Sequence, residues 1–478
     1  MRIFLDRTFM IDFLRNKLAN KKIVLLGFGR EGQSSLSLIR RVLPQVTLHI
    51  ADIDESITGN SLVIDDPNVF FKLGPDYLKG LDEFDLIMKT PGISMKDIDY
   101  SIDREKITSQ TDLFTEVYSD QIIGITGTKG KSTTSTLLHT ILKRAGKDAI
   151  LLGNIGRPAF NSIEDIHQDT LIVYEMSSHQ LENISAAPHI AILLNLYQEH
   201  LDAYHSFRDY QLAKMNILRF QNEDNYFIYN ADDSIISGLI REFQIRRNYQ
   251  PFSFENELAD GSFIRDGMIM YSDDCVSQPV LDLTKKRKLK GDHNVRNIMA
   301  VINACKILGI ENEIIQEGVA GFTGLEHRME YVGQFAGIFF YNDSIATIPE
   351  ATMEAIKALE KVDTLILGGF DRGIDYTGLA GFLSVSMVRN FIFTGEAGKK
   401  IRDLFEPRKK QDQRIFLINK FDDFLELALK HTLQGSICLL SPAAASYDEF
   451  QNFEMRGKRY KGLLKDTEKN TEYMDKTE

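Results

Sequence analysis

One stretch, QIIGITGTKGKSTT at 121–134, constrains the possible folds of this chain more than any other. An apolar run at 122–125 is typical of a buried strand, a glycine-rich turn follows at 127–130, and Lys131 and Ser132 open a helical pattern. A strand, loop and helix in this order present backbone N–H groups and a helix N-terminus to a phosphate. The lysine then reaches the outer phosphates, and the hydroxyl after it can bind Mg²⁺. The stretch therefore predicts a nucleotide-binding α/β domain.

The match to the phosphate-loop pattern GxxxxGK[ST] is imperfect. Its first glycine should stand at position 125, which is Ile125, and Gly124 stands one position early. The alternative is an ordinary turn between strand and helix, with Lys131 as a solvated surface charge. We favour the phosphate site because the strand before the loop and the helix after it both fit.

A second glycine pattern lies near the N-terminus, in KKIVLLGFGREG at 21–32. Gly27, Gly29 and Gly32 form GxGxxG between an expected strand and an expected helix, and a second strand ends at Asp52. An acidic residue about 20 positions after the last glycine is typical of a dinucleotide site. Alone this signal is weak, since another nucleotide-like ligand can use the same fold. Asp52 could bind a ribose hydroxyl or merely cap the strand end.

Composition excludes several classes of protein. The chain has 478 residues, of which 43% are hydrophobic and 26% charged, as expected for a soluble globular protein of several domains. No apolar run approaches the roughly 18 residues of a membrane span, and charges interrupt the N-terminus, unlike a signal peptide. A net charge of −12 argues against nonspecific nucleic-acid binding. Cys275, Cys305 and Cys438 fit no metal or disulfide spacing, so we expect core thiols in a reducing cytoplasm.

Polar side chains follow the apolar strands of the central region. Glu175 ends a strand expected at 171–174, and His200 follows one expected at 190–195. The carboxyl ends of parallel strands lie at one edge of a sheet, where ligands bind. Glu175 is then the acid expected near Mg²⁺, or else it caps the next helix. Because Mg²⁺ prefers oxygen ligands, the residues alone leave His200 open as a metal ligand or a structural histidine.

Lys214 lies among apolar residues of a helix expected at 207–220. A lone lysine in such a position usually extends to solvent. If it is buried instead, its pKa falls and it becomes a nucleophile or an amine open to modification.

A helix expected at 291–308 carries Asn294 and Asn297 on one face, where they could contact a base or cap the helix. The segment before it, 245–290, is expected to form short, irregular strands. The third region again alternates, with apolar strands expected at 338–341, 364–367, 390–394 and 437–440. A polar or glycine-rich cluster follows each strand, as in an open α/β sheet. The whole pattern predicts an α/β protein with domain boundaries near 117 and 322.

Together these clusters resemble the Mur ligases of bacterial cell-wall synthesis, and most closely the MurD type, which adds glutamate to UDP-N-acetylmuramoyl-L-alanine. The resemblance covers nearly the whole chain. Its carriers are ITGTKGKSTT (125–134), GNIG (153–156), EMSSHQLE (175–182), EHLD (199–202), the helix with Lys214, GDHNVRN (291–297), GLEHRME (324–330), NDSIAT (342–347), LGGFDRG (367–373) and SPAAASYDEFQNFEMRG (441–457).

The resemblance implies three domains: a Rossmann-like UDP-binding domain at 1–117, a central P-loop ATPase domain at 118–322 and a Rossmann-like glutamate-binding domain at 323–478. The GxGxxG pattern would then bind uridine diphosphate and not a nicotinamide. The residues implied for the UDP-linked substrate are Gly27, Gly29, Asp52, Thr90, Pro91, Gly92, Asn154, Ser177 and Gln180.

The resemblance also implies the rest of the site. The ATP-binding residues would be Gly127, Thr128, Lys129, Gly130, Lys131, Ser132, Thr133, Asn294, Asn297 and Arg328. Two Mg²⁺ ions would be bound by Ser132, Glu175, His200 and, if carbamylated, Lys214. Lys131, Lys214, His200 and Asp343 would be catalytic, and glutamate would be bound by Thr347, Arg372, Ser446 and the backbone at Phe453.

The expected reaction couples ATP to amide formation. A carboxylate does not react with an amine at neutral pH, and ATP converts it into an acyl phosphate that the glutamate amine attacks. Two positions depart from the usual MurD pattern: Ile345 replaces a lysine, and Arg372 stands where a lysine is common. Arginine binds a carboxylate with two parallel bonds and is no neutral replacement for lysine. We expect D-glutamate as the acceptor, with L-glutamate as the alternative.

Other functions explain less of the sequence. A folylpolyglutamate-synthetase-like ligase would not need the separate N-terminal domain. A nicotinamide-dependent oxidoreductase leaves the second glycine loop unexplained, and a non-catalytic nucleotide switch leaves the intact Lys131, Ser132, Glu175 and His200 unexplained. The expected partners are UDP-MurNAc-L-Ala, glutamate and ATP. The sequence carries no quaternary signal, so we expect a monomer by default.

Overall fold

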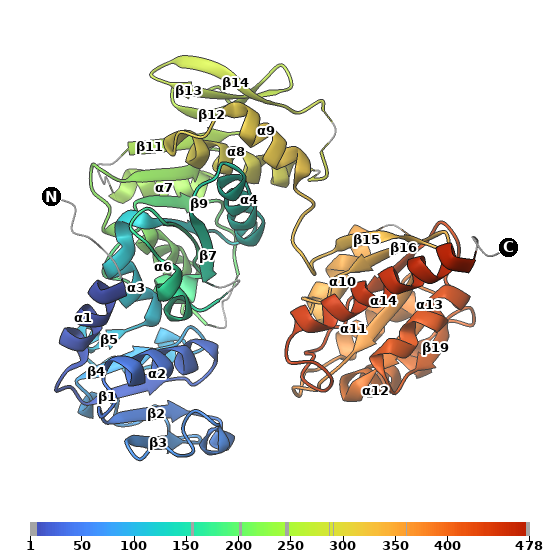
Figure 1. The fold of residues 1–478 in the computed structure, drawn as a ribbon, viewed down its shortest axis with the longest axis horizontal. Coiled ribbons are helices and arrows are strands. Elements are labelled where there is room, and N and C mark those ends of the chain that lie inside the picture. The colour runs from blue at the N-terminus through green and yellow to red at the C-terminus, as the bar shows by residue number, and fades with distance from the viewer. Residues whose placement is uncertain are drawn as a thin grey trace. The chain divides into compact units, whose positions relative to one another are not determined.

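The computed structural model describes residues 7–153, 157–199, 203–243, 248–285, 287–289, 291–359 and 361–474. Strands in these residues form three sheets (Figure 1). The chain divides into two compact units, 1–322 with the first two sheets and 323–478 with the third. The predicted α/β class is therefore confirmed.

The first sheet has five parallel strands in the order β3-β2-β1-β4-β5. The strands are β1 (Ile23–Leu26), β2 (Leu48–Asp52), β3 (Val69–Leu73), β4 (Leu86–Lys89) and β5 (Ile107–Thr108), and the helices are α1 (Arg7–Leu18), α2 (Arg30–Val42) and α3 (Gln110–Tyr118). The chain leaves β1 toward β2 on one side and returns to β4 on the other. Ligands of open α/β sheets bind at such a switch point, beyond the carboxyl ends of the strands.

The second sheet has nine strands in the order β14-β13-β12-β11-β10-β9-β6-β8-β7. Two pairings at the β14 edge, β12 with β13 and β13 with β14, are antiparallel. The strands are β6 (Ile122–Thr126), β7 (Ala149–Gly153), β8 (Leu171–Glu175), β9 (Ile190–Leu193), β10 (Tyr226–Asn230), β11 (Asn248–Ser253), β12 (Gly261–Arg265), β13 (Met268–Asp273) and β14 (Val276–Asp282). The helices are α4 (Lys131–Arg144), α5 (Ser178–Leu181), α6 (Phe207–Arg219), α7 (Ser234–Phe243), α8 (Asp292–Ile307) and α9 (Asn312–Gly321).

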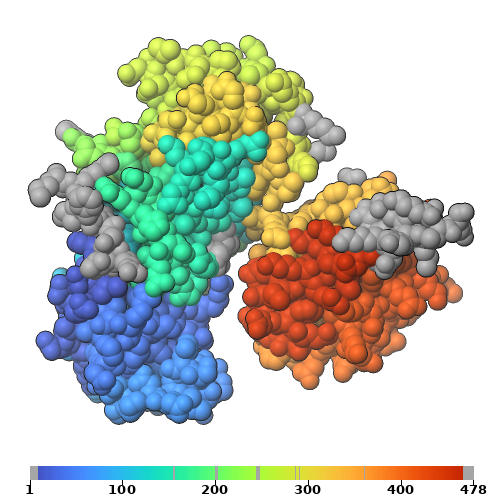
Figure 2. All heavy atoms as spheres, viewed as in Figure 1, coloured from blue at the N-terminus to red at the C-terminus, as the bar shows by residue number. Residues whose placement is uncertain are grey.

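The two sheets of the first unit share one hydrophobic cluster. It contains Leu25 and Ile50 of the first sheet together with Ile172 and Leu193 of the second. Helices α4, α8 and α9 cover the other face of the second sheet around a separate cluster that includes Leu138. In Figure 2 the blue and teal residues of this unit accordingly form one continuous surface. The predicted boundary at 117/118 stays a prediction, since α3 ends at Tyr118 inside this unit.

The third sheet has the order β15-β16-β20-β17-β18-β19, and only its β15–β16 pair is antiparallel. The strands are β15 (Glu330–Phe335), β16 (Ile338–Asn342), β17 (Val362–Gly368), β18 (Asn390–Thr394), β19 (Arg414–Leu417) and β20 (Ile437–Leu440), and the helices are α10 (Pro349–Ala358), α11 (Thr377–Val385), α12 (Gly395–Phe405), α13 (Phe424–His431) and α14 (Phe453–Met474). Short 3₁₀ helices occur at 55–59, 81–83, 95–97, 104–106, 119–121, 159–165, 406–408 and 421–423. Among the described residues, no helix is both long and apolar enough to cross a membrane.

Candidate active site

The loop between β6 and α4 has the backbone geometry of a phosphate cradle. Gly127 and Gly130 have φ of +153° and +88°, and Gly130 is the residue before α4 begins at Lys131. The first turn of α4 therefore directs its free N–H groups toward the loop, with Ser132 and Thr133 in that turn. A side chain at Gly130 would be strained at this φ of +88°, and an added Cβ would lie 2.4 Å from Oδ1 of Asn297, whose side chain would have to move.

Neighbouring strand ends hold this loop in place. Asn195, just after β9, accepts the N–H of Lys129 at 2.8 Å through its side chain and that of Thr128 at 3.0 Å through its carbonyl. The Thr128 hydroxyl lies 2.9 Å from the hydroxyl of Tyr210 on α6. Lys129 forms an exposed ion pair with Glu199 at 2.6 Å. The loop is thus supported from two sides independently of any ligand.

Gly124, the glycine that stood one position early in the pattern, has a packing role. An added Cβ at this position would lie 2.7 Å from Cγ of Pro188 and 3.1 Å from Sδ of Met176. The glycine is required by close contacts around β6, and the loop begins only at Gly127.

Lys131 and Lys214 approach the same side of the loop. The ammonium of Lys131 donates to the carbonyls of Gly127 at 2.9 Å and Thr128 at 3.1 Å. Lys214 is 2% exposed, lies over the Tyr210 ring and is 3.4 Å from the Thr126 hydroxyl. Burial, and then the charge of Lys131, lower the pKa of Lys214 well below its ordinary value. Of the two alternatives left open for this lysine, the structure shows the buried one.

Glu175 ends β8 and is fully buried beside β6, where it is paired in register with Ile125. The Ser135 hydroxyl lies 3.4 Å from its carboxylate. His200 and Asn154 lie outside the described residues. Within the described part of the chain, no group of three or more His, Cys, Asp and Glu side chains could hold a metal ion.

A cavity of about 340 Å³ adjoins the phosphate loop. Its lining comes from the loop, from strand ends of the second sheet and from the start of α8, and consists of Lys129, Gly130, Leu194, Asn195, Tyr197, Asn230, Phe252, His293, Arg296 and Asn297. Asn297 thus lies at the loop, with its side-chain amide 3.4 Å from that of Asn294. A cavity that combines apolar and polar side chains beside a phosphate cradle suits a nucleoside.

The structure brings the N-terminal glycine loop next to the turn after β4. Gly27 has φ of +91°, and an added Cβ there would lie 2.1 Å from the Thr90 hydroxyl. Thr90 donates to the Leu26 carbonyl through both its N–H, at 2.9 Å, and its hydroxyl, at 3.1 Å. Gly29, Pro91 and Gly92 therefore lie at the same switch point of the first sheet.

Asp52 acts on the backbone of this loop. One carboxylate oxygen accepts the N–H of Phe28 at 2.7 Å, and the other accepts that of Asp54 at 3.0 Å. Ser177 and Gln180 form a capping box at the start of α5, in which each side chain accepts the other's backbone N–H. The side-chain amide of Gln180 also donates to Glu31 on α2 at 2.8 Å. These predicted substrate residues therefore have structural partners in the protein.

In the second unit, Asp343 is 4% exposed directly after β16. Its carboxylate accepts the Ser441 hydroxyl at 2.7 Å and the N–H of Met329, the residue after Arg328, at 3.1 Å. Burial raises the pKa of Asp343 to about 6, and the bond from Ser441 opposes this shift.

The predicted glutamate residues lie on loops that contact one another. Arg372 is exposed and donates to the Thr347 carbonyl at 2.9 Å. The Phe453 carbonyl accepts the Ser344 hydroxyl at 2.8 Å, and Ser446 is 2% exposed beside Ala445.

Arg456 on α14 joins these loops. Its guanidinium donates to the carbonyls of Ser344 at 2.9 Å, Ala444 at 3.0 Å and Ala445 at 3.2 Å. It is 2% exposed, and burial lowers its pKa to about 10.

Comparison with known proteins identifies the family. Residues 125–305 match the family model of the Mur ligase middle domain, and residues 327–444 match that of the Mur ligase, glutamate ligase domain. The UDP-N-acetylmuramoylalanine–D-glutamate ligase of Clostridium botulinum is 32% identical over 464 residues, which cover 95% of this chain and 97% of that enzyme. The corresponding ligase of Clostridium kluyveri is 32% identical over 463 residues, with 95% and 99% covered. The chain belongs to the Mur ligase family.

Solved Mur ligases share the fold of this one. MurF from Acinetobacter baumannii superposes with a TM-score of 0.55 at 15% identity, covering 97% of this chain and 99% of that one. MurC from Thermotoga maritima gives a TM-score of 0.51 at 18% identity, covering 94% and 100%. This Mur ligase is therefore an ATP-dependent amide ligase of peptidoglycan synthesis, a family that uses Mg²⁺.

The residues of this Mur ligase fit ATP and Mg²⁺. Mg²⁺ bound with nucleotides usually takes only one or two protein oxygens and completes its shell with phosphates and water. Glu175 and the first-turn hydroxyl of Ser132 offer such oxygens beside the cradle, so a larger protein cluster is not needed. Bound there, the ion would neutralise charge on the transferred phosphate.

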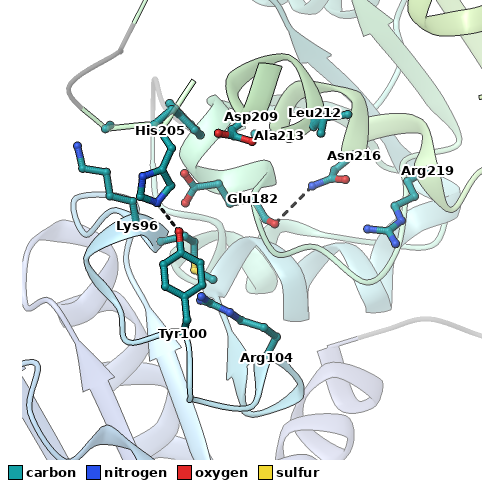
Figure 3. Close-up of a pocket in the computed structure, with 13 residues that line it drawn as sticks. Lys96, Tyr100, Arg104, Glu182, His205, Asp209, Leu212, Ala213, Asn216 and Arg219 are labelled. Carbon is teal, nitrogen blue, oxygen red and sulfur yellow. Dashed lines mark hydrogen bonds between the residues drawn. The ribbon is translucent and has the colours of Figure 1, made fainter. Parts of the chain in front are cut away.

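A further cavity of about 340 Å³ lies between the 95–104 segment and α6 (Figure 3). Tyr100 and His205 meet through their hydroxyl and Nε2 at its edge, and Asn216 donates to the Glu182 carbonyl at 3.4 Å. Lys214 on the same helix is not among the residues that line this cavity and instead lies 3.4 Å from the Thr126 hydroxyl.

Sequence reasoning missed several residues of these sites. Arg456 lies in the SPAAASYDEFQNFEMRG motif at 441–457. Its neighbours in the sequence do not indicate that this arginine is buried. Phe252 and Asn230 follow ordinary strand patterns and reach the nucleotide cavity only through the sheet order. Glu31 gave the clearest sequence signal of these residues. It lies in the glycine motif, in the first turn of α2. A negative charge there is unexpected, because an anionic ligand is proposed to bind at the same helix N-terminus.

Proposed function

We propose that this Mur ligase adds D-glutamate to UDP-N-acetylmuramoyl-L-alanine with consumption of ATP. The observation that carries the proposal is 32% identity, over 95% of the chain, to ligases named for that reaction. The matched glutamate ligase domain supports glutamate as the amino acid. The match to these ligases covers 95% of the chain and so includes the N-terminal sheet. A folylpolyglutamate-synthetase-like enzyme would not need that domain, so the match favours the MurD reaction.

The proposed chemistry has two steps. The alanine carboxylate attacks the terminal phosphate of ATP, which gives an acyl phosphate and ADP. The glutamate amine then attacks the acyl carbon, loses a proton and displaces inorganic phosphate. Positioning and charge neutralisation are the main tasks of the protein in such transfers.

Residues of the first unit serve the first step. Lys131, with its ammonium over the loop, would stabilise charge on the transferred phosphate. Ser132 and Glu175 would hold Mg²⁺, with His200 as a proposed ligand of a second ion. Carbamylation of Lys214 requires a neutral amine, and its lowered pKa supplies one. Asn294, Asn297 and Arg328 are proposed to contact ATP.

The second unit would bind the amino acid. Arg372 and Thr347 are proposed for one carboxylate of glutamate, and Ser446 with the Phe453 backbone for the other. Asp343 would act beside the reacting groups. We further propose that the enzyme works as a monomer in the cytoplasm, where ATP is available.

Phosphate release tests the proposal. Purified enzyme is incubated with ATP, Mg²⁺, UDP-MurNAc-L-Ala and either D- or L-glutamate. Release with D-glutamate and a product heavier by one glutamyl residue are expected. Release with L-glutamate alone would favour the alternative acceptor, and release with neither isomer would exclude both.

A further inference from the structure

A buried polar bridge joins the two sheets of the first unit. It consists of Glu31 on α2, Lys89 at the end of β4, and Gln180 and Glu182 around α5. The Lys89 ammonium lies 3.2 Å from the Glu182 carboxylate, and the two side chains are 2% and 6% exposed. The Gln180 amide donates to Glu31 at 2.8 Å. Two contacts thus cross from the first sheet to the α5 segment of the second.

Lys89 also shapes the turn that follows it. Its ammonium donates to the Ile93 carbonyl at 2.7 Å and lies 3.5 Å from the Thr90 carbonyl. The turn closes on itself, because the Ile93 N–H donates to the Thr90 carbonyl at 3.2 Å. One buried cation therefore holds both ends of the Thr90–Ile93 turn and at the same time pairs with Glu182.

The stability of the fold alone does not explain such a pair. Removing two charges from water costs much of what their attraction returns, and well-packed apolar side chains often serve a core equally well. Burial lowers the pKa of Lys89, as expected for an ammonium taken out of water. In some proteins, however, a buried polar or ionic pair specifies the relative position of the segments that carry it. This pair joins two segments that both carry proposed substrate residues.

We propose that Lys89 is a positioning residue, which locks the Thr90–Pro91–Gly92 turn to the Ser177–Gln180 segment so that the UDP-linked substrate meets one preformed surface. The ligand in this statement rests on the proposed function. The mechanical coupling of the two segments does not, since it follows from the contacts of Lys89 and Glu182 alone. Lys89 itself need not touch the substrate.

The test compares three variants with the wild-type enzyme. Lys89→Met with Glu182→Met replaces the pair by apolar side chains of similar length, and Glu182→Gln is a near-isosteric second variant that removes only the charge. Lys22→Met is the matched control, because Lys22, just before β1, forms an exposed ion pair with Glu83, just before β4, with side chains 43% and 66% exposed.

The first readout is amide hydrogen exchange without ligands. If the lock exists, both bridge variants exchange faster at 90–93 and also at 177–182, by about tenfold for the double variant and less for Glu182→Gln, and the control does not. Wild-type exchange at both segments in folded bridge variants would overturn the coupling. This readout remains decisive even if the wild-type enzyme fails to use UDP-MurNAc-L-Ala, an outcome that would count against the proposed function alone.

The second readout separates positioning from folding. With the double variant near the wild-type melting temperature, we expect KM for UDP-MurNAc-L-Ala to rise about tenfold, while kcat and KM for ATP change less than about threefold. Two outcomes would show that the bridge serves the fold and not the substrate surface. One is an equal rise of KM for UDP-MurNAc-L-Ala and KM for ATP. The other is an unchanged KM for UDP-MurNAc-L-Ala in a variant with faster exchange.

Discussion

The phosphate loop and the proposed amino-acid site are built in different ways. In the loop, the binding groups are backbone N–H groups, and glycines at positive φ set their directions. In the second unit, the proposed binding groups are mainly side chains on loops that Arg456 holds together. A backbone site leaves little freedom, since a positive φ strongly favours glycine at positions such as Gly130. A side-chain site can change its specificity by single substitutions, and the departures Ile345 and Arg372 both occur there.

The largest effect is expected where the loop relies on a side chain. Lys131→Met should lower kcat by at least about 10³-fold, because a cation placed on the transferred phosphate acts mainly in the transition state. Lys143→Met is the control, since that lysine lies exposed in the last turn of the same helix. Steady-state phosphate release measures both, and similar losses in the two variants would contradict a special role for Lys131.

Lys214→Met should nearly abolish activity and yet stabilise the fold. Its pKa is lowered in the folded state, so protonation costs stability at every pH below the unfolded pKa of about 10.4. We expect the variant to be more stable by about 1 kcal/mol or more at pH 7, and by less at pH 10. Urea unfolding at both pH values measures this. A destabilised variant at pH 7 would indicate that the lysine is carbamylated or firmly paired.

Gly130→Ala tests the backbone half of the comparison directly. The added Cβ meets Oδ1 of Asn297 at 2.4 Å, so the Asn297 side chain must move, and alanine is also strained at the φ of +88°. We expect KM for ATP to rise about tenfold and the free energy of unfolding to fall by about 1–3 kcal/mol. Gly146→Ala is matched, since Gly146 also has positive φ, +71°, but an added Cβ has nothing within 4 Å. It should lose stability without a change in KM.

Arg372→Lys tests the side-chain half. Arg372 donates to the Thr347 carbonyl with one nitrogen and keeps other donors for a carboxylate, whereas lysine cannot form both contacts with the same geometry. We expect KM for glutamate to rise about three- to tenfold and KM for ATP to stay constant. An unchanged KM for glutamate would remove Arg372 from the amino-acid site.

The smallest effect is a shift in pH dependence. The pKa of Asp343 is raised to about 6, so the folded state takes up a proton between about pH 6 and pH 4 and gains stability there as pH falls. If the ionised form is needed for catalysis, kcat declines below about pH 6. Ser441→Ala removes a bond that lowers this pKa and should move the decline upward by less than about one unit.

Thr352→Val is the control for that shift, because Thr352 contacts Ser441 and not Asp343 among the bonds of this cluster. A decline at the same pH in Ser441→Ala and the wild-type enzyme would assign it to another group.

Local patterns predicted the elements that carry the site. The strands before Glu175 and Asp343 and the helix after Lys131 lie where their apolar periodicity placed them. The segment at 245–290 was predicted as irregular strands, and it forms the ordered strands β11 to β14. Long-range pairing decides this, because edge strands gain their order from neighbours in the sheet.

Side-chain roles were predicted less well, because they depend on burial. The sequence left Lys214 between solvent and core, and packing of α6 against β6 decides for the core. The sequence left two roles open for Asp52, binding of a ribose hydroxyl or capping of the strand end. In the structure its carboxylate accepts the backbone N–H groups of Phe28 and Asp54. Gly124 stands one position early in the phosphate-loop pattern, and contacts with Pro188 give this glycine a separate role in packing.

The sequence by itself determined the strand–loop–helix units and membership in the Mur ligases, because these depend on short stretches in a constant order. The tertiary structure decided which polar groups meet the buried charges. Gln180 reaches Glu31 across 149 residues, and Arg456 reaches Ser344 across 112. Such pairs form only when the sheets have closed around them, because a charge is held in a core by the partner and the exclusion of water that folding brings together.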